Sequence, residues 1–414
     1  MKAGFAEAII TPKDGRCILA GYGEDIWSHG VHDDLYASAV YFEDGGSKAV
    51  LISFDLIGLD EEIISRLKSR VRKAVNVDFD SIFFTCTHTH AGPVISQSKA
   101  SEAEYIPEYL KFLESQVEEV SQEAASRAQE FELRVNRAYV DENINRRFFL
   151  NTGEYLYVPR YKDLIPITNE YADKELGILY FCPKNMKGAK WPHPYGVIVN
   201  YSMHPLTAGN TSLLISADVP GVVRELIKES MECLTCYITG AAGDNHPKAP
   251  EGGFAETRRV GRVLATEVIK RRWDSLPIKD PIRLKCLTRS IRLKYRSMEE
   301  LKAIPGWQDF HPRISDKAGE PVDVEYSLLA IGPILFIGVP GELVSELGRI
   351  LKWCSPFKRT YIMYQATGDF GYIAHPNAYR WGGYEAVCGL LSPSSVRPLI
   401  NAILDSAEEL YKQE

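Results

Sequence analysis

Residues 81–93 read Ser-Ile-Phe-Phe-Thr-Cys-Thr-His-Thr-His-Ala-Gly-Pro, an apolar run that leads into two histidines and a Gly-Pro stop. The apolar residues at its start are typical of a buried strand. Because residues i and i+2 of an extended chain face the same side, we expect His88 and His90 to emerge together at the strand end. Sites of α/β proteins usually lie at such ends, and neutral imidazole is the commonest protein ligand for a catalytic metal. The stretch therefore predicts an α/β fold with a metal site.

The rest of the chain is organised in similar units of strands and helices. In the first third, the turn signal Glu-Asp-Gly-Gly-Ser-Lys at 43–48 separates two strand-like runs, and a helical pattern follows at 61–75. The last third repeats this order, which suggests a distant internal duplication. We predict mixed β-sheets flanked by helices, in one large domain over residues 1–414. The other expected elements are strands at 37–42, 49–54, 195–201, 234–238, 326–331, 334–339 and 360–364 and helices at 219–231 and 343–353.

The composition excludes several classes of protein. A net charge of −7 disfavours nucleic-acid binding, and 45% apolar with 25% charged residues is ordinary for a globular chain. The longest apolar run, 328–339, is interrupted by Gly332 and Pro333 and is too short for a transmembrane segment. Since no signal segment follows Met1 and the eight cysteines form no disulfide framework, we expect a cytoplasmic protein. The sequence gives no indication of the oligomeric state.

Other predicted strand ends carry side chains that can complete a site. His204 follows the strand at 195–201, Glu342 follows Val-Pro-Gly, and Asp244 and His246 lie in a loop rich in glycine and alanine. Each has an ordinary alternative. A histidine before proline can cap a turn, a glutamate can favour a helix start, and such a loop can be a simple tight turn. Because these residues follow different predicted strands, they can gather at one edge of a sheet, and this favours a shared active site.

Short motifs run through the whole chain in a fixed order. They are Ala-Glu-Ala-Ile-Ile-Thr-Pro at 6–12, Ala-Gly-Tyr-Gly at 20–23, His-Asp-Asp-Leu-Tyr-Ala at 32–37, Ser-Phe-Asp-Leu at 53–56, Thr-His-Thr-His-Ala-Gly-Pro at 87–93, Asn-Ile-Asn-Arg at 143–146, Asn-Tyr-Ser-Met-His-Pro at 200–205, Gly-Asp at 243–244, Val-Pro-Gly-Glu at 339–342, Gly-Tyr at 371–372, Tyr379 and Tyr-Glu at 384–385. In order and spacing, these motifs resemble those of the catalytic domain of the neutral/alkaline (non-lysosomal) ceramidases, a family of zinc amidases.

The resemblance implies a metal site and neighbouring catalytic groups. His90 and Arg146 fall on family positions that hydrogen-bond or polarise the reacting group. Two histidines and a carboxylate are a catalytic-type zinc set, to which the family adds a tyrosine. The implied zinc ligands are His88, His204, Glu342 and Tyr372.

The chain also departs from the family pattern in two ways. His246 stands where the family carries a serine regarded as essential, so a serine-dependent mechanism cannot be transferred. The C-terminal β-sandwich domain and the signal peptide of the secreted ceramidases are missing from the sequence, which points to a compact intracellular relative.

These features predict hydrolysis of an amide bond by a metal-activated water. We expect His246 or His90 to move the proton, Arg146 to stabilise the oxyanion, and Asp244 to orient a ligand histidine. The partner is a small-molecule or lipid-like acyl-amide substrate, with no nucleic acid. A metal-dependent esterase and a catalytically altered metal-binding protein are the alternatives.

Overall fold

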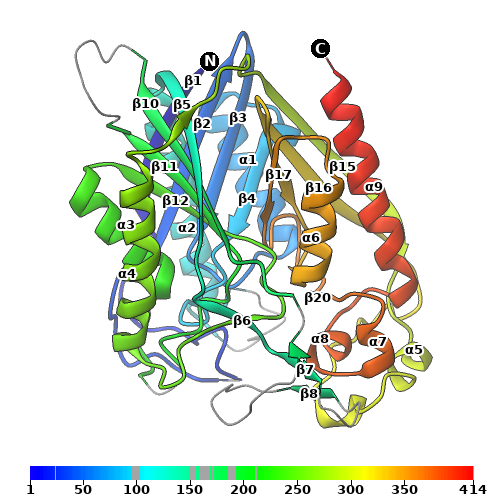
Figure 1. Cartoon of the computed structure of the whole chain (residues 1–414). Coiled ribbons are helices and arrows are strands. Elements are labelled where there is room, and N and C mark those ends of the chain that lie inside the picture. Colours follow the sequence, from blue (N-terminus) through cyan, green and yellow to red (C-terminus); the bar gives the residue numbers. More distant parts are fainter. Residues whose placement is uncertain are drawn as a thin grey trace.

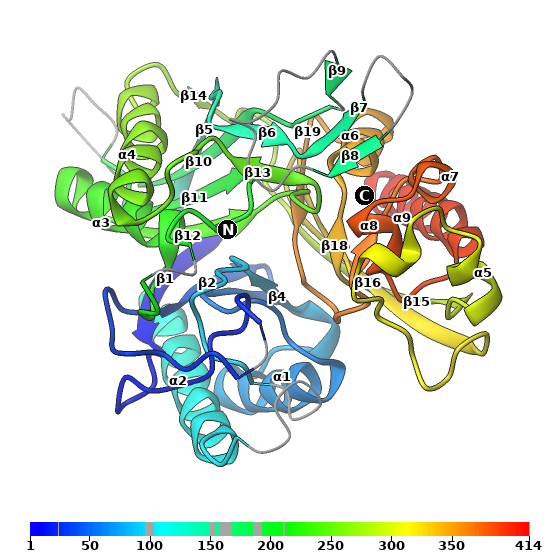
Figure 2. The same cartoon turned by 90° about the horizontal axis from the view of Figure 1, so that it is seen from below.

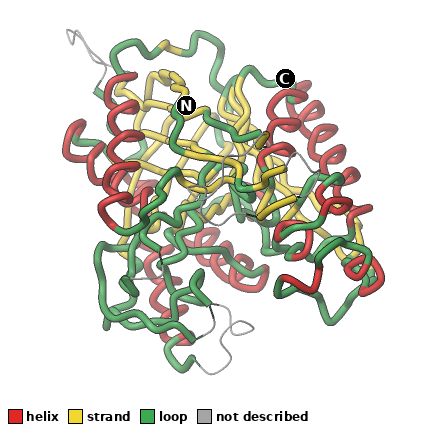
Figure 3. Tube along the Cα trace, turned by 60° about the horizontal axis from the view of Figure 1, so that its bottom comes forward, coloured by secondary structure: helices red, strands yellow, loops and turns green. Residues whose placement is uncertain are grey.

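The computed structural model describes residues 1–23, 25–95, 103–149, 155–157, 168–169, 171–184, 193–209 and 212–413. Strands fill its centre and helices lie on the outside (Figure 3). Mixed parallel and antiparallel sheets with flanking helices confirm the predicted α/β class. Within the described ranges, none of the helices combines the length and apolar character that crossing a membrane requires.

The larger sheet contains nine strands in the order β12-β11-β10-β5-β1-β2-β3-β4, and β14 pairs with β5. The strand pairs β3–β4 and β11–β12 are parallel, whereas the other pairs are antiparallel. The strands are β1 (Lys2–Ile9), β2 (Tyr36–Asp44), β3 (Ser47–Phe54), β4 (Ile82–Cys86), β5 (Gln129–Tyr139), β10 (Glu175–Pro183), β11 (Gly196–Tyr201), β12 (Leu234–Thr239) and β14 (Leu276–Pro277).

The second sheet has the order β15-β16-β17-β19, and only its β17–β19 pair is parallel. Its strands are β15 (Leu284–Lys294), β16 (Pro321–Ile331), β17 (Ile334–Gly338) and β19 (Arg359–Met363). Smaller ladders join β6 (Asn143–Asn145) to β13 (Asn245–Pro247), β18 (Glu342–Leu343) to β20 (Tyr372–Ile373), and β7 (Arg147–Phe149) to β8 (Tyr155–Tyr157) and β9 (Thr168–Asn169).

Three pairs of helices cover the outer faces of the sheets and surround the centre in the view from below (Figure 2). The pair α1/α2 packs on β1 to β4, α3/α4 on β10 to β12, and α6/α9 on the second sheet. The helices are α1 (Glu61–Val75), α2 (Ile106–Ser126), α3 (Asp218–Met231), α4 (Phe254–Arg271), α5 (Met298–Lys302), α6 (Ser345–Cys354), α7 (Ala378–Trp381), α8 (Tyr384–Val387) and α9 (Pro393–Lys412).

A buried apolar cluster joins the two large sheets. Phe5, Phe181 and Ile198 of the larger sheet pack in this cluster with Leu329 and Phe336 of the second sheet. Alternate residues of each strand therefore face either this central layer or an outer helix, as the two-residue period of a strand requires. Fully burying one such side chain contributes about 1.5–3 kcal/mol, so the central layer holds the two sheets firmly together.

Three parts of the chain share one topology: an antiparallel strand pair, a helix, and a strand parallel to the second member of the pair. They are β2-β3-α1-β4, β10-β11-α3-β12 and β16-β17-α6-β19 (Figure 1; β19 is labelled in Figure 2). The order of strands and helix that we expected to repeat in the first and last thirds of the chain is confirmed. The middle third has the same order. Each unit sends the carboxyl ends of its parallel strands to one edge, where ligands bind in open α/β sheets.

Candidate metal centre

Hydrogen bonds join the carboxyl ends of β4, β12 and β19. The amide of Cys86 donates to the carbonyl of Tyr364 over 3.2 Å, and the amide of Tyr364 donates to the carbonyl of Thr239 over 3.2 Å. The hydroxyl of Thr239 donates to the carbonyl of Thr87 over 2.7 Å. Segments from all three units therefore meet, and the residues that follow these strands lie together.

The first two histidines lie beyond the end of their strand, because β4 ends at Cys86. His88 has a φ of 70°, in the left-handed region that non-glycine residues rarely adopt and that is often found at functional sites. The ring centroids of His88 and His90 are 5.1 Å apart. The expected neighbourhood of the two rings is confirmed, but it arises from a left-handed turn and not from an extended strand.

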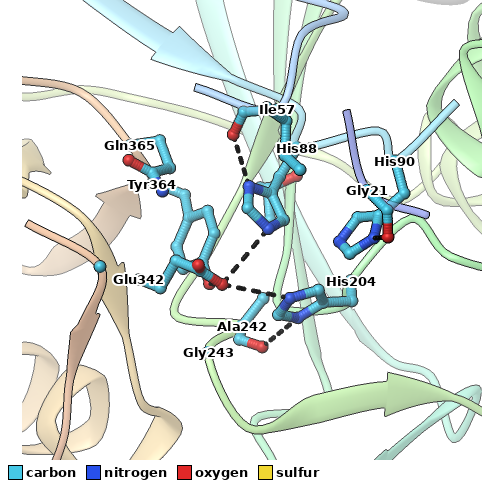
Figure 4. A network of polar contacts seen from close by, with 12 residues as sticks. Gly21, Ile57, His88, His90, His204, Ala242, Gly243, Glu342, Tyr364 and Gln365 are labelled. Atoms are coloured by element: carbon cyan, nitrogen blue, oxygen red, sulfur yellow. Dashed lines mark hydrogen bonds and ion pairs between the residues drawn. The ribbon is translucent and has the colours of Figure 1, made fainter. Parts of the chain in front are cut away.

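Three imidazoles are held in the same way, each with Nδ1 bonded to a backbone carbonyl (Figure 4). An Nδ1–H donor fixes the neutral tautomer in which Nε2 carries a lone pair, which is the arrangement typical of metal-binding histidines. The bonds run from His88 to Ile57 (2.5 Å), from His90 to Gly21 (3.1 Å) and from His204 to Ala242 (2.7 Å).

The other ring nitrogens converge on one place. One ligand atom from each of His88, His90 and His204 lies within 4.8 Å of the others, so this group can hold a metal ion. The Nε2 atom of His90 is buried and hydrogen-bonds to no described residue, and the buried Nε2 of His204 has the carboxylate of Glu342 beside it. Burial lowers the pKa of His90 well below its usual value and that of His204 to about 4, so both rings are neutral at pH 7. The donor set fits a metal cation.

Glu342 adds a carboxylate to the three imidazoles. Its Oε2 lies 3.3 Å from Nε2 of His88 and 3.3 Å from Nε2 of His204 (Figure 4). Burial alone raises the pKa of Glu342, but the interactions with His88 and His204 outweigh burial and hold the pKa well below its usual value. The carboxylate is therefore ionised at neutral pH. The hydroxyl of Tyr364 donates to Oε2 over 3.0 Å and so fixes its orientation.

Tyr372 lies beside Glu342, because the two residues are register partners in the parallel β18–β20 ladder. The guanidinium carbon of Arg146 lies 5.4 Å from the centre of the Tyr372 ring. Burial, and then the charge of Glu342, raise the pKa of Tyr372 well above its usual value, so the side chain is a neutral phenol unless a cation binds it. Tyr372 thus adjoins Glu342, and Glu342 in turn contacts His88 and His204, the other two residues that the resemblance implied as ligands.

Arg146 links the candidate metal centre to a buried ionic cluster. Its Nε donates to Oε1 of Glu385 over 2.6 Å, its Nη1 contacts Nε2 of His246 at 3.0 Å, and its Nη2 donates to the carbonyl of Gly243 over 2.9 Å. Arg147 donates to the other carboxylate oxygen of Glu385 over 2.7 Å. The centroids of His246 and His204 are 6.1 Å apart, so the predicted catalytic residues adjoin the histidine group.

Asp244 is near the centre but does not hold a histidine as expected. Its Oδ1 accepts from the amide of Ser345 over 2.8 Å, and its Oδ2 accepts from Nδ2 of Asn145 over 2.8 Å. The carbonyl of Ala242 instead holds His204. The expected orienting role of Asp244 is therefore corrected, because its carboxylate fixes the start of α6 and the β6 strand.

Two residues of the site carry no signal in the sequence that would reveal their contacts. Tyr364 is expected only as the last residue of a strand, since an aromatic residue in an apolar run gives no sign of a polar contact. Glu385 belongs to the Tyr-Glu motif at 384–385, but nothing in the sequence indicates its partners. A buried glutamate 0% exposed that pairs with two arginines is visible only in three dimensions.

The architecture is that of the neutral ceramidases, as the resemblance implied. The fold is similar to that of the neutral ceramidase from Pseudomonas aeruginosa, with a TM-score of 0.75 and 16% identity over 98% of this chain and 74% of that one. A ceramidase complexed with C2 is also similar, with a TM-score of 0.79 and 15% identity over 99% of this chain and 75% of that one. No protein-family model matches the chain, and no curated protein matches it in sequence.

Proposed function

We propose that this protein is a zinc-dependent hydrolase that cleaves the amide bond of an N-acyl substrate. One observation supports this most strongly: the imidazoles of His88 and His204, each held through Nδ1, place Nε2 3.3 Å from the carboxylate of Glu342 in a ceramidase-like fold. Histidine nitrogens with one carboxylate are the donor set of catalytic zinc sites. The proposed ligands are His88, His204, Glu342 and Tyr372.

When bound, zinc supplies a Lewis acid that lowers the pKa of water and polarises a carbonyl oxygen. The residues of the chain do the rest. The carbonyls of Ile57 and Ala242 keep the rings of His88 and His204 in one orientation. His90 has an unprotonated Nε2 that can accept a proton from the attacking water, and His246 is the alternative acceptor. Each role needs groups fixed before the substrate arrives.

The fold comparison supports the proposed substrate class. Because the similar solved structures are ceramidases, we propose a lipid-like or small acyl amide, with the corresponding ester as a close variant. The similarity extends over 98–99% of the chain, which supports the proposal that residues 1–414 act as one catalytic domain.

Metal analysis combined with hydrolysis of a panel of N-acyl amides and esters tests the proposal. The wild-type protein should contain one zinc per chain, lose hydrolysis with a chelator and regain it with zinc. His88→Gln and Glu342→Gln should lose the metal and the activity, whereas the neighbouring variant His90→Gln should keep the metal and lose only the activity. Full metal content in both His88→Gln and Glu342→Gln would show that the ligands are assigned wrongly.

A catalytically altered metal-binding protein is the second candidate, because His246 occupies the place of the family's serine. This candidate predicts that chelation lowers the unfolding temperature and that the zinc-loaded protein hydrolyses no amide or ester of the panel. Hydrolysis that disappears and returns with zinc excludes it.

A further inference from the structure

Arg146 determines which ring nitrogen is protonated in His246, the residue that stands where the ceramidase family carries a serine. An arginine guanidinium stays protonated in proteins and carries donors but no acceptor. Glu385 and the carbonyl of Gly243 hold two edges of the Arg146 guanidinium, at 2.6 Å and 2.9 Å. The guanidinium is buried, with Arg146 3% exposed, so it has little freedom to turn.

The remaining edge of Arg146 lies against His246. Its Nη1 is 3.0 Å from Nε2 of His246. Because Nη1 can only donate, Nε2 must accept and therefore carries no proton. A neutral imidazole has one N–H, so the proton of His246 is on Nδ1. Burial and the charge of Arg146 lower the pKa of His246 well below its usual value, which agrees with a ring that stays neutral.

The position of His246 is also fixed, and its Nδ1 is available. The residue pairs with Ile144 in the β6–β13 ladder, and its ring lies 6.1 Å from that of His204. His246 keeps part of its surface exposed, and its Nδ1 forms no hydrogen bond with the described residues. A fixed N–H donor therefore adjoins the proposed metal centre.

We propose that His246 is a neutral hydrogen-bond donor that binds the substrate carbonyl oxygen through Nδ1–H, and that it is not the proton shuttle. This inference rests on the proposed function and deepens it. Arg146 and Glu385 are then positioning residues that fix the tautomer, and His90 is left as the proton acceptor. A fixed donor of this kind stabilises the negative charge that develops on the oxygen, and removing one such donor typically costs about 10²–10³-fold in kcat.

Two substitutions at His246 distinguish a donor from a base. The amide nitrogen of asparagine falls near the position of Nδ1, so His246→Asn keeps a donor but has no group that accepts a proton at neutral pH. His246→Ala has neither. We expect the asparagine variant to stay within about tenfold of wild-type kcat, and the alanine variant to lose about 10²–10³-fold with unchanged zinc content. Equal losses in the two variants would overturn the inference.

A spectroscopic measurement tests the tautomer without an activity assay. Long-range ¹H–¹⁵N correlation spectra of the zinc-loaded protein with ¹⁵N-labelled histidine identify which ring nitrogen carries the proton, and the spectrum of His246→Asn assigns the signal. We expect the Nδ1–H form, and an Nε2–H form overturns the inference. The proposed function fails separately, if the zinc-loaded wild-type protein hydrolyses none of the panel.

Discussion

The hydroxyl of Tyr364 donates a 3.0 Å hydrogen bond to Oε2 of Glu342, the carboxylate oxygen that also lies 3.3 Å from Nε2 of His88 and of His204. Its phenol thus orients a proposed ligand, while its backbone carbonyl accepts from the amide of Cys86 and ties the strand ends together. Groups that orient metal ligands typically contribute 10–100-fold to metal affinity.

Tyr364→Phe should therefore weaken zinc binding by about 10–100-fold while the fold is retained. The substitution removes only the hydroxyl, so Glu342 keeps its place but loses the bond that fixes Oε2. Competition with a chromophoric chelator measures the affinity. Tyr237→Phe is the matched control, because Tyr237 is also buried and its hydroxyl bonds to no described residue. If the two variants bind zinc equally well, the hydrogen bond has no role in holding the ligand.

Gly21→Ala should reduce hydrolysis through His90. A Cβ at Gly21 would lie 2.2 Å from Cβ, Cγ and Nδ1 of His90, closer than any real contact, so the ring must move. A displacement of about 1 Å can cost about 10²-fold in rate. We expect kcat to fall at least about tenfold with full zinc content. At Gly58 an added Cβ would meet Gln365 at an ordinary 3.4 Å, so Gly58→Ala is the control. Loss of zinc in Gly21→Ala would instead indicate that His90 is a metal ligand.

Much of the fold could be predicted because hydrophobic periodicity is a local signal. The helical pattern at 61–75 corresponds to α1 (Glu61–Val75), and the strand expected at 195–201 corresponds to β11 (Gly196–Tyr201). The packing of the two large sheets has no such signal. Phe181 and Phe336 meet in the central layer although they are far apart in sequence, and either residue would suit any buried strand.

The candidate site could be predicted only as far as side-chain types reveal chemistry. Histidines and a glutamate at strand ends indicate a metal site, but the carbonyl of Ala242 that holds His204 leaves no mark in the sequence. For the same reason Asp244 was given an orienting role that a backbone group performs. The left-handed φ of His88 depends on contacts made by the folded chain, such as the hydrogen bond that its backbone amide donates to the carbonyl of Leu56.

Arg224→Met should destabilise the protein by about 3–5 kcal/mol. Arg224 pairs with Asp55, which is 0% exposed, and its Nη1 donates to Oδ1 over 3.0 Å. Removing the cation leaves a buried carboxylate without its charge partner. Arg292→Met is the control, because Arg292 and Asp323 form an exposed pair that contributes about 0–1 kcal/mol. Urea unfolding measures the loss of unfolding free energy in both variants. Similar losses would show that burial does not increase the contribution of the Arg224–Asp55 ion pair.

Asp244 should make the stability depend on pH between about 4 and 6. Burial raises its pKa from 3.8 to about 6, so the folded protein holds a proton over a range in which the unfolded chain has released it. The stabilisation from this group is complete below pH 3.8 and is lost as the pH rises through 6. A shift of about two units corresponds to about 3 kcal/mol.

The comparison of wild type with Asp244→Asn isolates this effect. Asparagine does not titrate, and the loss of one acceptor for Ser345 or Asn145 adds an offset that is independent of pH. Urea unfolding of both proteins from pH 4 to pH 6.5, with equal zinc, should therefore show the difference in unfolding free energy moving by up to about 3 kcal/mol in favour of the variant. A constant difference over this range would mean that the hydrogen bonds from Ser345 and Asn145 compensate the burial of the carboxylate, and that Asp244 is ionised throughout.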